Sequence, residues 1–293
     1  MISIKFFLIL CLIQVLMLLN LNAENVVIKK KGNKFFLKIN NKPFFIKGVG
    51  CGQVFGKDHI NYFPLAKEIG ANTLRTWGME QGNDDFFKEA YRYSFMVCAG
   101  MWLPHCNYMG KEKVFSYIND TEKLNQIEKD ILSYVEKFKN HPSLLLWNVG
   151  NEVLMFTKEE KEKIAFCKFL EKLIQKIKII DPLHPVTYAC AGLAPIDYIV
   201  KYVPSIDVIG VNTYGSVDFV NSVLAEKYPS KPFMLTEFGP KGSWECPKDR
   251  FGKSIEEADY EKSFYYQCYA EDILSNKTNC LGGFAFYLGD TSQ

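Results

Sequence analysis

The fold of this chain is decided by the stretch Leu144-Leu145-Leu146-Trp147-Asn148-Val149-Gly150-Asn151-Glu152-Val153. Its first part is apolar and strand-like, and it ends in an Asn-Glu pair, which places an acid where a buried strand opens to solvent. Far downstream, Pro232-Phe233-Met234-Leu235-Thr236-Glu237-Phe238-Gly239 repeats the design: an apolar strand, a terminal Glu and a glycine that turns the chain. The sequence therefore indicates two carboxylates, each at the end of a buried strand.

Further apolar segments of the same kind occur along the whole chain. The strand candidates are residues 44–49, 73–77, 95–101, 144–148, 186–189, 208–212, 233–235 and 284–286. The stretches between them have apolar residues at three- and four-residue spacing, which predicts helices; they include residues 62–69, 84–93, 121–139, 158–180 and 255–274. Eight strands that alternate with helices predict an α/β fold with a parallel sheet closed into a (β/α)8 TIM barrel. An open doubly wound sheet is disfavoured because no glycine-rich phosphate loop follows the first strand.

The two ends of the predicted barrel are unusual. Residues 26–39 alternate apolar and polar side chains around Gly32-Asn33, the pattern of an N-terminal β-hairpin. Only residues 287–293 follow the eighth strand, too few for a closing helix, so the final helix is expected to be missing. Two interpretations stay open: the barrel is capped in another way, for example by the hairpin at its base, or the chain is a truncated form of a longer protein.

The first 23 residues have the pattern of a secretory signal peptide. Lys5 supplies the positive start, residues 6–19 form an apolar run, and Leu21-Asn22-Ala23 supplies a small-residue cleavage site. The run is shorter than the roughly 20 residues that a spanning helix needs, which favours cleavage over a membrane anchor. We therefore expect a signal peptide at 1–23 and one barrel domain at 24–293. The mature chain should be secreted, with no stable membrane insertion.

The composition of the chain limits the kinds of partner and cofactor that are expected. The formal net charge of +2 comes from interspersed charges without a basic stripe, which argues against nucleic acid as a partner. Eight cysteines follow the signal; none has the close spacing of a zinc site, so neither a metal nor a cofactor is expected. Cys98 and Cys190 lie in strand-like runs and are interpreted as small buried hydrophobes. Disulfide pairing and oligomeric state are left open by the sequence.

Polar residues that finish the apolar strands are the candidates for chemistry, because barrel enzymes build their sites at the carboxyl ends of the strands. In chain order they are Arg75, Trp77, His105, Asn107, Asn148, Asn151, Glu152, Asn212, Tyr214 and Glu237. Cleavage of a glycosidic bond with retention needs a protonated carboxyl and an ionised carboxylate about 5 Å apart. The ends of the fourth and seventh strands face each other across a barrel mouth. The set therefore predicts a glycosidase.

Two motifs carry a family resemblance. Trp147-Asn148-Val149-Gly150-Asn151-Glu152 and Thr236-Glu237-Phe238-Gly239 resemble the acid/base and nucleophile motifs of retaining (β/α)8 glycoside hydrolases, most closely the catalytic barrel of glycoside hydrolase family 2. The early part of the chain is also similar to β-1,3-glucanosyltransferases, through Lys42-Pro43-Phe44-Phe45-Ile46-Lys47-Gly48-Val49 and Gly70-Ala71-Asn72-Thr73-Leu74-Arg75-Thr76-Trp77. The resemblance runs from about residue 35 to residue 288, nearly the whole expected mature chain.

The resemblance implies roles for individual residues. Glu152 would be the acid/base and Asn151 would hold the 2-hydroxyl of the sugar. Glu237 would be the nucleophile, with Arg75 and Tyr214 oriented toward it. The physical chemistry agrees, because a nearby guanidinium favours an ionised carboxylate, while a less compensated and partly desolvated Glu keeps its proton longer.

Two further positions are assigned by the same resemblance. His105 lies where relatives have a sugar-contacting residue after the third strand. Relatives commonly end the eighth strand with a tryptophan platform, whereas this sequence reads Phe286-Tyr287-Leu288; Tyr287 is the candidate to replace that ring, although Leu288 takes the tryptophan's place in the motif. Trp77, Trp102 and Trp147 are interpreted as barrel packing rather than sugar platforms.

The sequence thus predicts a secreted retaining glycoside hydrolase that acts on β-linked oligo- or polysaccharides through two carboxylates. Two alternatives remain. A transglycosylase would use the same residues and pass the sugar to another glycan. A non-catalytic glycan-binding protein on a decayed barrel is suggested by the altered aromatic after the eighth strand and by the missing last helix.

Overall fold

The computed structural model describes residues 25–32, 34–56, 59–107, 110–275 and 279–289, and the predicted signal peptide lies outside them. The elements, in chain order, are β1 (Val26–Lys31), β2 (Lys34–Ile39), β3 (Lys42–Phe44), β4 (Ile46–Gly50), α2 (Tyr62–Glu68), β5 (Thr73–Arg75), α3 (Asp84–Arg92), β6 (Met96–Met101), α4 (Thr121–Phe138), β7 (Leu144–Asn151), α5 (Glu160–Ile180), β8 (Val186–Ala191), α6 (Ile196–Tyr202), β9 (Val208–Tyr214), α7 (Val217–Lys227), β10 (Phe233–Gly239), α8 (Asp259–Ser275) and β11 (Cys280–Ala285).

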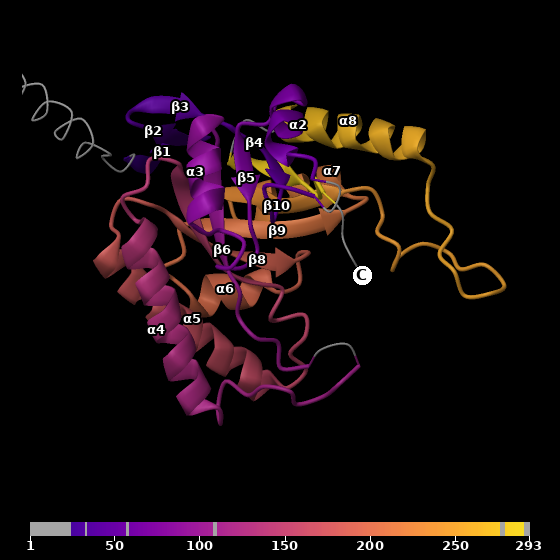
Figure 1. The fold of residues 1–293 in the computed structure, drawn as a ribbon. Helices are drawn as coiled ribbons and strands as arrows, with labels where there is room; N and C mark the ends of the chain where they lie inside the picture. The colour runs from indigo at the N-terminus through magenta and orange to yellow at the C-terminus, as the bar shows by residue number, and fades with distance from the viewer. Residues whose placement is uncertain (1–24, 33, 57–58, 108–109, 276–278, 290–293) are drawn as a thin grey trace, which may run out of the picture.

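The eight strands β4 to β11 form a closed parallel barrel in which each strand pairs with its neighbours in chain order and β11 pairs with β4 (Figure 1). A helix follows each of the first seven barrel strands, and within the described residues none follows β11. The predicted (β/α)8 barrel is therefore confirmed. Helices α6, of seven residues, and α7, of eleven, were not among the predicted segments.

The barrel strands are nearly continuous apolar runs because both of their faces are buried, as parallel sheets require. All eight residues of β7 are buried. Helix α5 shows the complementary pattern: Phe166, Leu170, Leu173, Ile174 and Ile177 are fully buried at three- and four-residue spacing. Full burial of one such side chain stabilises the fold by roughly 1.5–3 kcal/mol. This packing gives the strand ends a rigid frame.

The predicted N-terminal hairpin is present and covers the base of the barrel. Strands β1 and β2 pair antiparallel with Val26 opposite Ile39, and β3 extends this small sheet. Phe44 ends β3, so the first barrel strand begins at Ile46 rather than at residue 44. One buried cluster joins the small sheet to the lower barrel; its members are Val26, Leu37, Ile46, Cys98, Leu145, Leu146, Val208, Met234, Leu281 and Phe284.

An apolar pocket of about 460 Å³ lies on the outer face of β4 and β11, between the end of α2 and helix α8. Ile69, Ile273 and Leu274 contribute to its walls, and Tyr287 and Leu288 lie at one side. This is the part of the barrel wall that no described helix covers. The pocket therefore belongs to the outside of the barrel and not to its mouth.

Three further observations concern the described part of the chain. Its eight cysteines are all free thiols, and Cys98 and Cys190 are fully buried, as their interpretation as small hydrophobes requires. Among these residues no group of three or more His, Cys, Asp or Glu side chains is placed to hold a metal ion. None of the described helices is both long enough and apolar enough to cross a membrane.

Candidate active site

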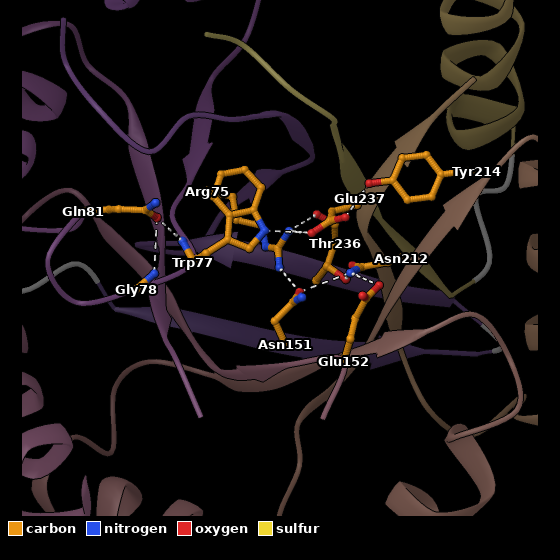
Figure 2. Close-up of polar contacts among 10 residues, drawn as sticks. All are labelled: Arg75, Trp77, Gly78, Gln81, Asn151, Glu152, Asn212, Tyr214, Thr236 and Glu237. Atoms are coloured by element: carbon orange, nitrogen blue, oxygen red, sulfur yellow. Dashed lines mark hydrogen bonds and ion pairs between the residues drawn. The ribbon is translucent and has the colours of Figure 1, made fainter. Parts of the chain in front are cut away.

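Polar side chains from four barrel strands meet at the carboxyl ends of the strands (Figure 2). Arg75 is the last residue of β5, Asn151 the last of β7 and Tyr214 the last of β9, while Glu237 lies near the end of β10. Glu152 follows β7 directly. Apart from the adjacent Asn151 and Glu152, these residues are far apart in sequence, and closure of the barrel brings them together.

Glu237 is buried at the centre of this group and accepts three hydrogen bonds from side chains. Its Oε1 accepts from Arg75 Nη1 at 2.7 Å and from Trp77 Nε1 at 2.8 Å, and its Oε2 accepts from the Tyr214 hydroxyl at 2.5 Å. The Arg75 side chain is completely buried. A buried guanidinium needs a carboxylate partner, and Glu237 is that partner. Negative charge on Glu237 is therefore stabilised from both of its oxygens.

Arg75 also fixes the neighbouring amide. Its Nη2 donates to Asn151 Oδ1 at 2.8 Å, and Asn212 Nδ2 donates to the same oxygen at 3.2 Å. The Asn151 side chain is thus oriented through its oxygen, which identifies the other end of the amide as the nitrogen donor. Arg75 Nη1 further donates to the Thr236 carbonyl at 3.0 Å, which ties β5 to β10.

The backbone at Glu152 has an unusual conformation. Its φ angle is 55°, in the left-handed region that non-glycine residues rarely adopt, and Gly150 two residues earlier has a φ of 84°. The Glu152 amide donates to the Ala189 carbonyl at 2.9 Å, which holds the chain as it leaves β7. This turn directs the Glu152 side chain toward Asn212, as Figure 2 shows.

The pKa of the Glu152 carboxyl is raised above its ordinary value of 4.5, first by burial and second by the negative charge of Glu237. A hydrogen bond from Asn212 Nδ2 to Glu152 Oε1, 2.9 Å long, and the charge of Arg75 oppose the rise. Asn212 is itself oriented by the Thr236 hydroxyl, which donates to Asn212 Oδ1 at 2.7 Å. Glu237 is thus paired with a cation, while Glu152 is biased toward its protonated form. This difference allows one carboxylate to act as a nucleophile and the other carboxyl to act as an acid.

His105 contacts the backbone of Asn151, and neither carboxylate is among its recorded hydrogen-bond partners. Its Nε2 is 2.8 Å from the Asn151 carbonyl oxygen, and its ring stacks on Phe156 with centroids 4.5 Å apart. Because a carbonyl only accepts, Nε2 carries the hydrogen. Burial lowers the pKa of His105, so the neutral ring braces the end of β7. His105 thus contacts the backbone of Asn151, and its own contact with a sugar stays a prediction.

The two aromatic residues after β11, Phe286 and Tyr287, both contact the Trp77 ring. Phe286 lies edge-on to Trp77 and to Tyr214, with ring centroids 5.8 and 5.7 Å away. Tyr287 contacts the Trp77 ring from 5.6 Å and also borders the outer pocket. Leu288 packs against the main core. The ring that touches two partners of Glu237 is therefore Phe286, which the sequence analysis did not select.

Three other residues take part in the site; Asn212 and Trp77 were among the strand-end candidates from sequence, and Thr236 was not. Asn212, Thr236 and Trp77 make direct contacts in it, and the Trp77 backbone is held by Gln81 Oε1 at 2.7 Å. Trp77 therefore does more than pack. Trp147 is fully buried and donates to Asp181 at 2.8 Å, in agreement with a packing role. Thr236 lies directly before Glu237 at the end of an apolar run, which is the signal that could have selected it.

Comparison with known proteins agrees with this geometry. The family model described as glycosyl hydrolases family 2, TIM barrel domain, matches residues 28–291. The chain belongs to this family of glycoside hydrolases. It is 25% identical over 225 residues to a β-glucuronidase from Homo sapiens, covering 69% of this chain and 32% of that protein. It is 27% identical over 180 residues to the β-galactosidase BoGH2A from Bacteroides ovatus, covering 48% of this chain and 21% of that protein.

Solved structures share the fold. A β-glucuronidase from Bacteroides uniformis matches with a TM-score of 0.67 and 18% identity, covering 89% of this chain and 32% of that chain. A β-D-glucuronidase from Dictyoglomus thermophilum matches with a TM-score of 0.65 and 20% identity, covering 91% of this chain and 48% of that chain. The chain thus spans less than half the length of these relatives, and the part shared with them is the barrel.

Proposed function

We propose that this protein is a retaining β-glycosidase in which Glu237 is the nucleophile and Glu152 the acid/base. The observation that carries the proposal is the contrast between the two carboxyls at one barrel mouth. Glu237 accepts from Arg75, Trp77 and Tyr214, whereas burial and the Glu237 charge raise the pKa of Glu152. Such a pair supplies both groups that double displacement requires.

In the first step, a Glu237 oxygen forms a bond to the anomeric carbon as the bond to the glycosidic oxygen breaks. The Glu152 proton passes to that oxygen, so the leaving sugar departs as a neutral alcohol. In the second step, the Glu152 carboxylate takes a proton from water, whose oxygen attacks the anomeric carbon and releases Glu237. Glu152 is then protonated again, and the sugar keeps its original configuration.

The neighbouring residues have roles that follow from their contacts. Arg75 and Tyr214 hold Glu237 in place and stabilise the carboxylate when it leaves the sugar again. The Asn151 amide, fixed through its oxygen by Arg75 and Asn212, presents its nitrogen as a donor for the 2-hydroxyl of the reacting sugar. Asn212 positions the acid. Preorganised donors of this kind cost no rearrangement during the reaction.

The substrate class is a β-linked glycan. The relatives that support it are β-glucuronidases and a β-galactosidase, so glucuronide and galactoside are the first sugars to test. The experiment is mass spectrometry of the intact protein after incubation with activated 2-deoxy-2-fluoro β-glycosides of glucuronic acid, galactose, glucose and mannose. We expect one sugar added to the peptide that contains Glu237, and none in the Glu237→Gln variant.

The matched control is Glu152→Gln, which keeps the nucleophile and should still form the adduct with an activated leaving group. An adduct on another residue would overturn the assignment of Glu237. A product that first appears with the inverted anomeric configuration by NMR would overturn retention. Absence of any adduct and any hydrolysis in folded protein would overturn the proposed activity itself.

We also propose that the protein is exported. The support is the charged start, apolar run and small-residue site within residues 1–23. Expression in a secreting host should yield extracellular protein whose first residue is Glu24. Retention inside the cell, or an intact Met1 on extracellular protein, would contradict cleavage at this site.

A further inference from the structure

Two exposed tryptophans stand on opposite sides of the barrel mouth. Trp102 directly follows β6, and Trp244 lies in residues 240–258, between β10 and α8. Their exposed fractions are 43% and 63%. In the closed strand order β6 and β10 are four strands apart, which places them across the barrel from each other. The exposure of Trp102 differs from the packing role expected from sequence.

Trp244 is held in place without being covered. Its ring meets Tyr214 edge-on, with centroids 5.2 Å apart and an interplanar angle of 89°. A Cβ added to Gly242 would lie 2.3 Å from the indole, so the ring rests directly on this glycine. The segment is braced by Glu245 N, which donates to the Gly242 carbonyl at 2.9 Å, and by the Ser254 hydroxyl, which donates to the Ser243 carbonyl at 2.7 Å.

Trp102 is connected to the site from the other side. Its ring lies 5.0 Å from His105, and His105 contacts the Asn151 carbonyl. From Asn151 the contacts continue across the mouth to the second tryptophan. The complete series of residues in contact is Trp102, His105, Asn151, Arg75, Glu237, Tyr214 and Trp244.

A large exposed aromatic ring that is already ordered is suited to binding. Leaving indole surface in water forgoes the hydrophobic gain of covering it, and an ordered ring loses little entropy when a ligand covers it. The axial C–H groups of a β-linked pyranose form a flat apolar face that stacks on such a ring, while the hydroxyls point outward. A ligand that covers both rings crosses the barrel mouth, where Glu237 and Glu152 lie.

We propose that Trp102 and Trp244 are sugar-binding platforms on either side of the bond that is cleaved. The substrate is then an extended β-linked glycan that occupies at least three positions, one on each tryptophan and one at the carboxylates. This inference rests on the proposed glycosidase function and adds the length of the substrate to it. It also gives the two tryptophans a role in specificity rather than in bond cleavage.

The test measures binding in the Glu152→Gln background, which prevents turnover of unactivated glycans. The probes are laminari-, cello-, manno- and galacto-oligosaccharides and oligosaccharides that contain β-linked glucuronic acid, each of one to six sugars, with affinity followed by calorimetry. We expect the affinity to rise with length up to at least three sugars in one series. Trp244→Ala and Trp102→Ala should each weaken the longest probe about tenfold and leave the monosaccharide nearly unchanged. Phenylalanine at either position should restore part of the loss.

Phe251→Ala is the matched control, because Phe251 lies in the same segment as Trp244 and is 79% exposed. It should leave every affinity unchanged. The proposal would be overturned if affinity did not increase with the length of the probe, or if no probe bound. It would also be overturned if the tryptophan variants lost as much affinity for short probes as for long ones, or no more than the Phe251→Ala control.

The two proposals can fail separately. Adducts on Glu237 together with length-independent binding would leave the glycosidase standing and remove the platforms. If binding depends on length and needs both tryptophans, but the protein forms no adduct and cleaves no glycan, the sugar-binding platforms would stand and the proposed glycosidase activity would be rejected.

Discussion

Arg75 and Glu237 form an ion pair with 2.7 Å between Nη1 and Oε1, and neither side chain is more than 8% exposed. The residue proposed to attack the sugar is therefore also the partner that neutralises a buried guanidinium. Loss of one member of such a pair leaves an uncompensated charge in the interior, which commonly costs about 3–5 kcal/mol.

Glu237→Gln should consequently lower the free energy of unfolding by about 3 kcal/mol at pH 7, in addition to abolishing activity. Glu152→Gln is the matched comparison, since it removes a carboxylate that burial and the Glu237 charge disfavour. It should change stability by less than about 0.5 kcal/mol or increase it. Urea unfolding of both variants measures the difference, and equal losses would show that the Arg75 pair contributes little.

The raised pKa of Glu152 predicts a sign for the pH dependence. Between the ordinary value of 4.5 and the folded pKa, the folded state binds more protons than the unfolded state, so stability falls as pH rises through this window. The contribution is fully present below the unfolded pKa and lost above the folded one. Glu152→Gln should remove this slope from unfolding curves recorded across the window, and an unchanged slope would assign it to other groups.

Glu152 should also set the alkaline limit of the pH–activity profile, because the acid must be protonated.

Replacement of Glu237 by Gln removes the negative charge that is the second largest cause of the raised pKa of Glu152, and it should lower that pKa. NMR titration of ¹³C-labelled Glu side chains in both proteins provides the measurement. If the Glu152 resonance titrates at the same pH in the variant, the two carboxyls are not electrostatically coupled.

The left-handed backbone at Glu152 predicts an unusual order of stabilities. A residue with a Cβ pays about 1 kcal/mol at a φ of 55°, and glycine does not. Glu152→Gly should therefore be more stable than Glu152→Ala by about 1 kcal/mol, opposite to the usual ranking. Thermal unfolding of the two inactive variants compares them directly. Greater stability of the alanine variant would argue against a left-handed conformation.

His105 should be neutral and protonated on Nε2 at pH 7. The Asn151 carbonyl at 2.8 Å requires a donor, and burial lowers the pKa of the ring below its ordinary value of 6.5. Long-range ¹H–¹⁵N spectra of histidine-labelled protein distinguish the tautomers. A ring protonated on Nδ1 alone would mean that His105 does not support Asn151.

The ends of the strands could be predicted from sequence because a polar residue after an apolar run marks each of them. Glu152 and Glu237 each terminate an apolar run, and Arg75 interrupts one, so sequence alone selected them. The contacts made by Asn212 and Trp77 come from closure of the barrel, which brings the ends of β5, β7, β9 and β10 to one mouth and leaves no mark in any local period. Residues 44–46 are an uninterrupted apolar run, and this hid the change of sheet after Phe44.

Phe286 illustrates a different limit. The motif drew attention to Tyr287 and Leu288, whereas Phe286 is the ring that meets both Trp77 and Tyr214. Tyr287 also contacts Trp77, and the two neighbouring rings lie 5.4 Å apart. No local pattern indicates which of two adjacent aromatic residues after the last strand reaches Tyr214, and Tyr287 borders the outer pocket as well.

Closure of the barrel through β4 and β11 also has a consequence for synthesis. The hairpin β1–β2 leaves the ribosome before the barrel strands, yet Val26 and Leu37 share one buried cluster with Leu281 and Phe284 of the last barrel strand. A two-stranded hairpin alone is marginally stable at best, and contacts between distant parts of a chain form slowly. The cluster beneath the barrel is therefore complete only after β11 has emerged, so the hairpin waits for the last barrel strand before its apolar face is covered.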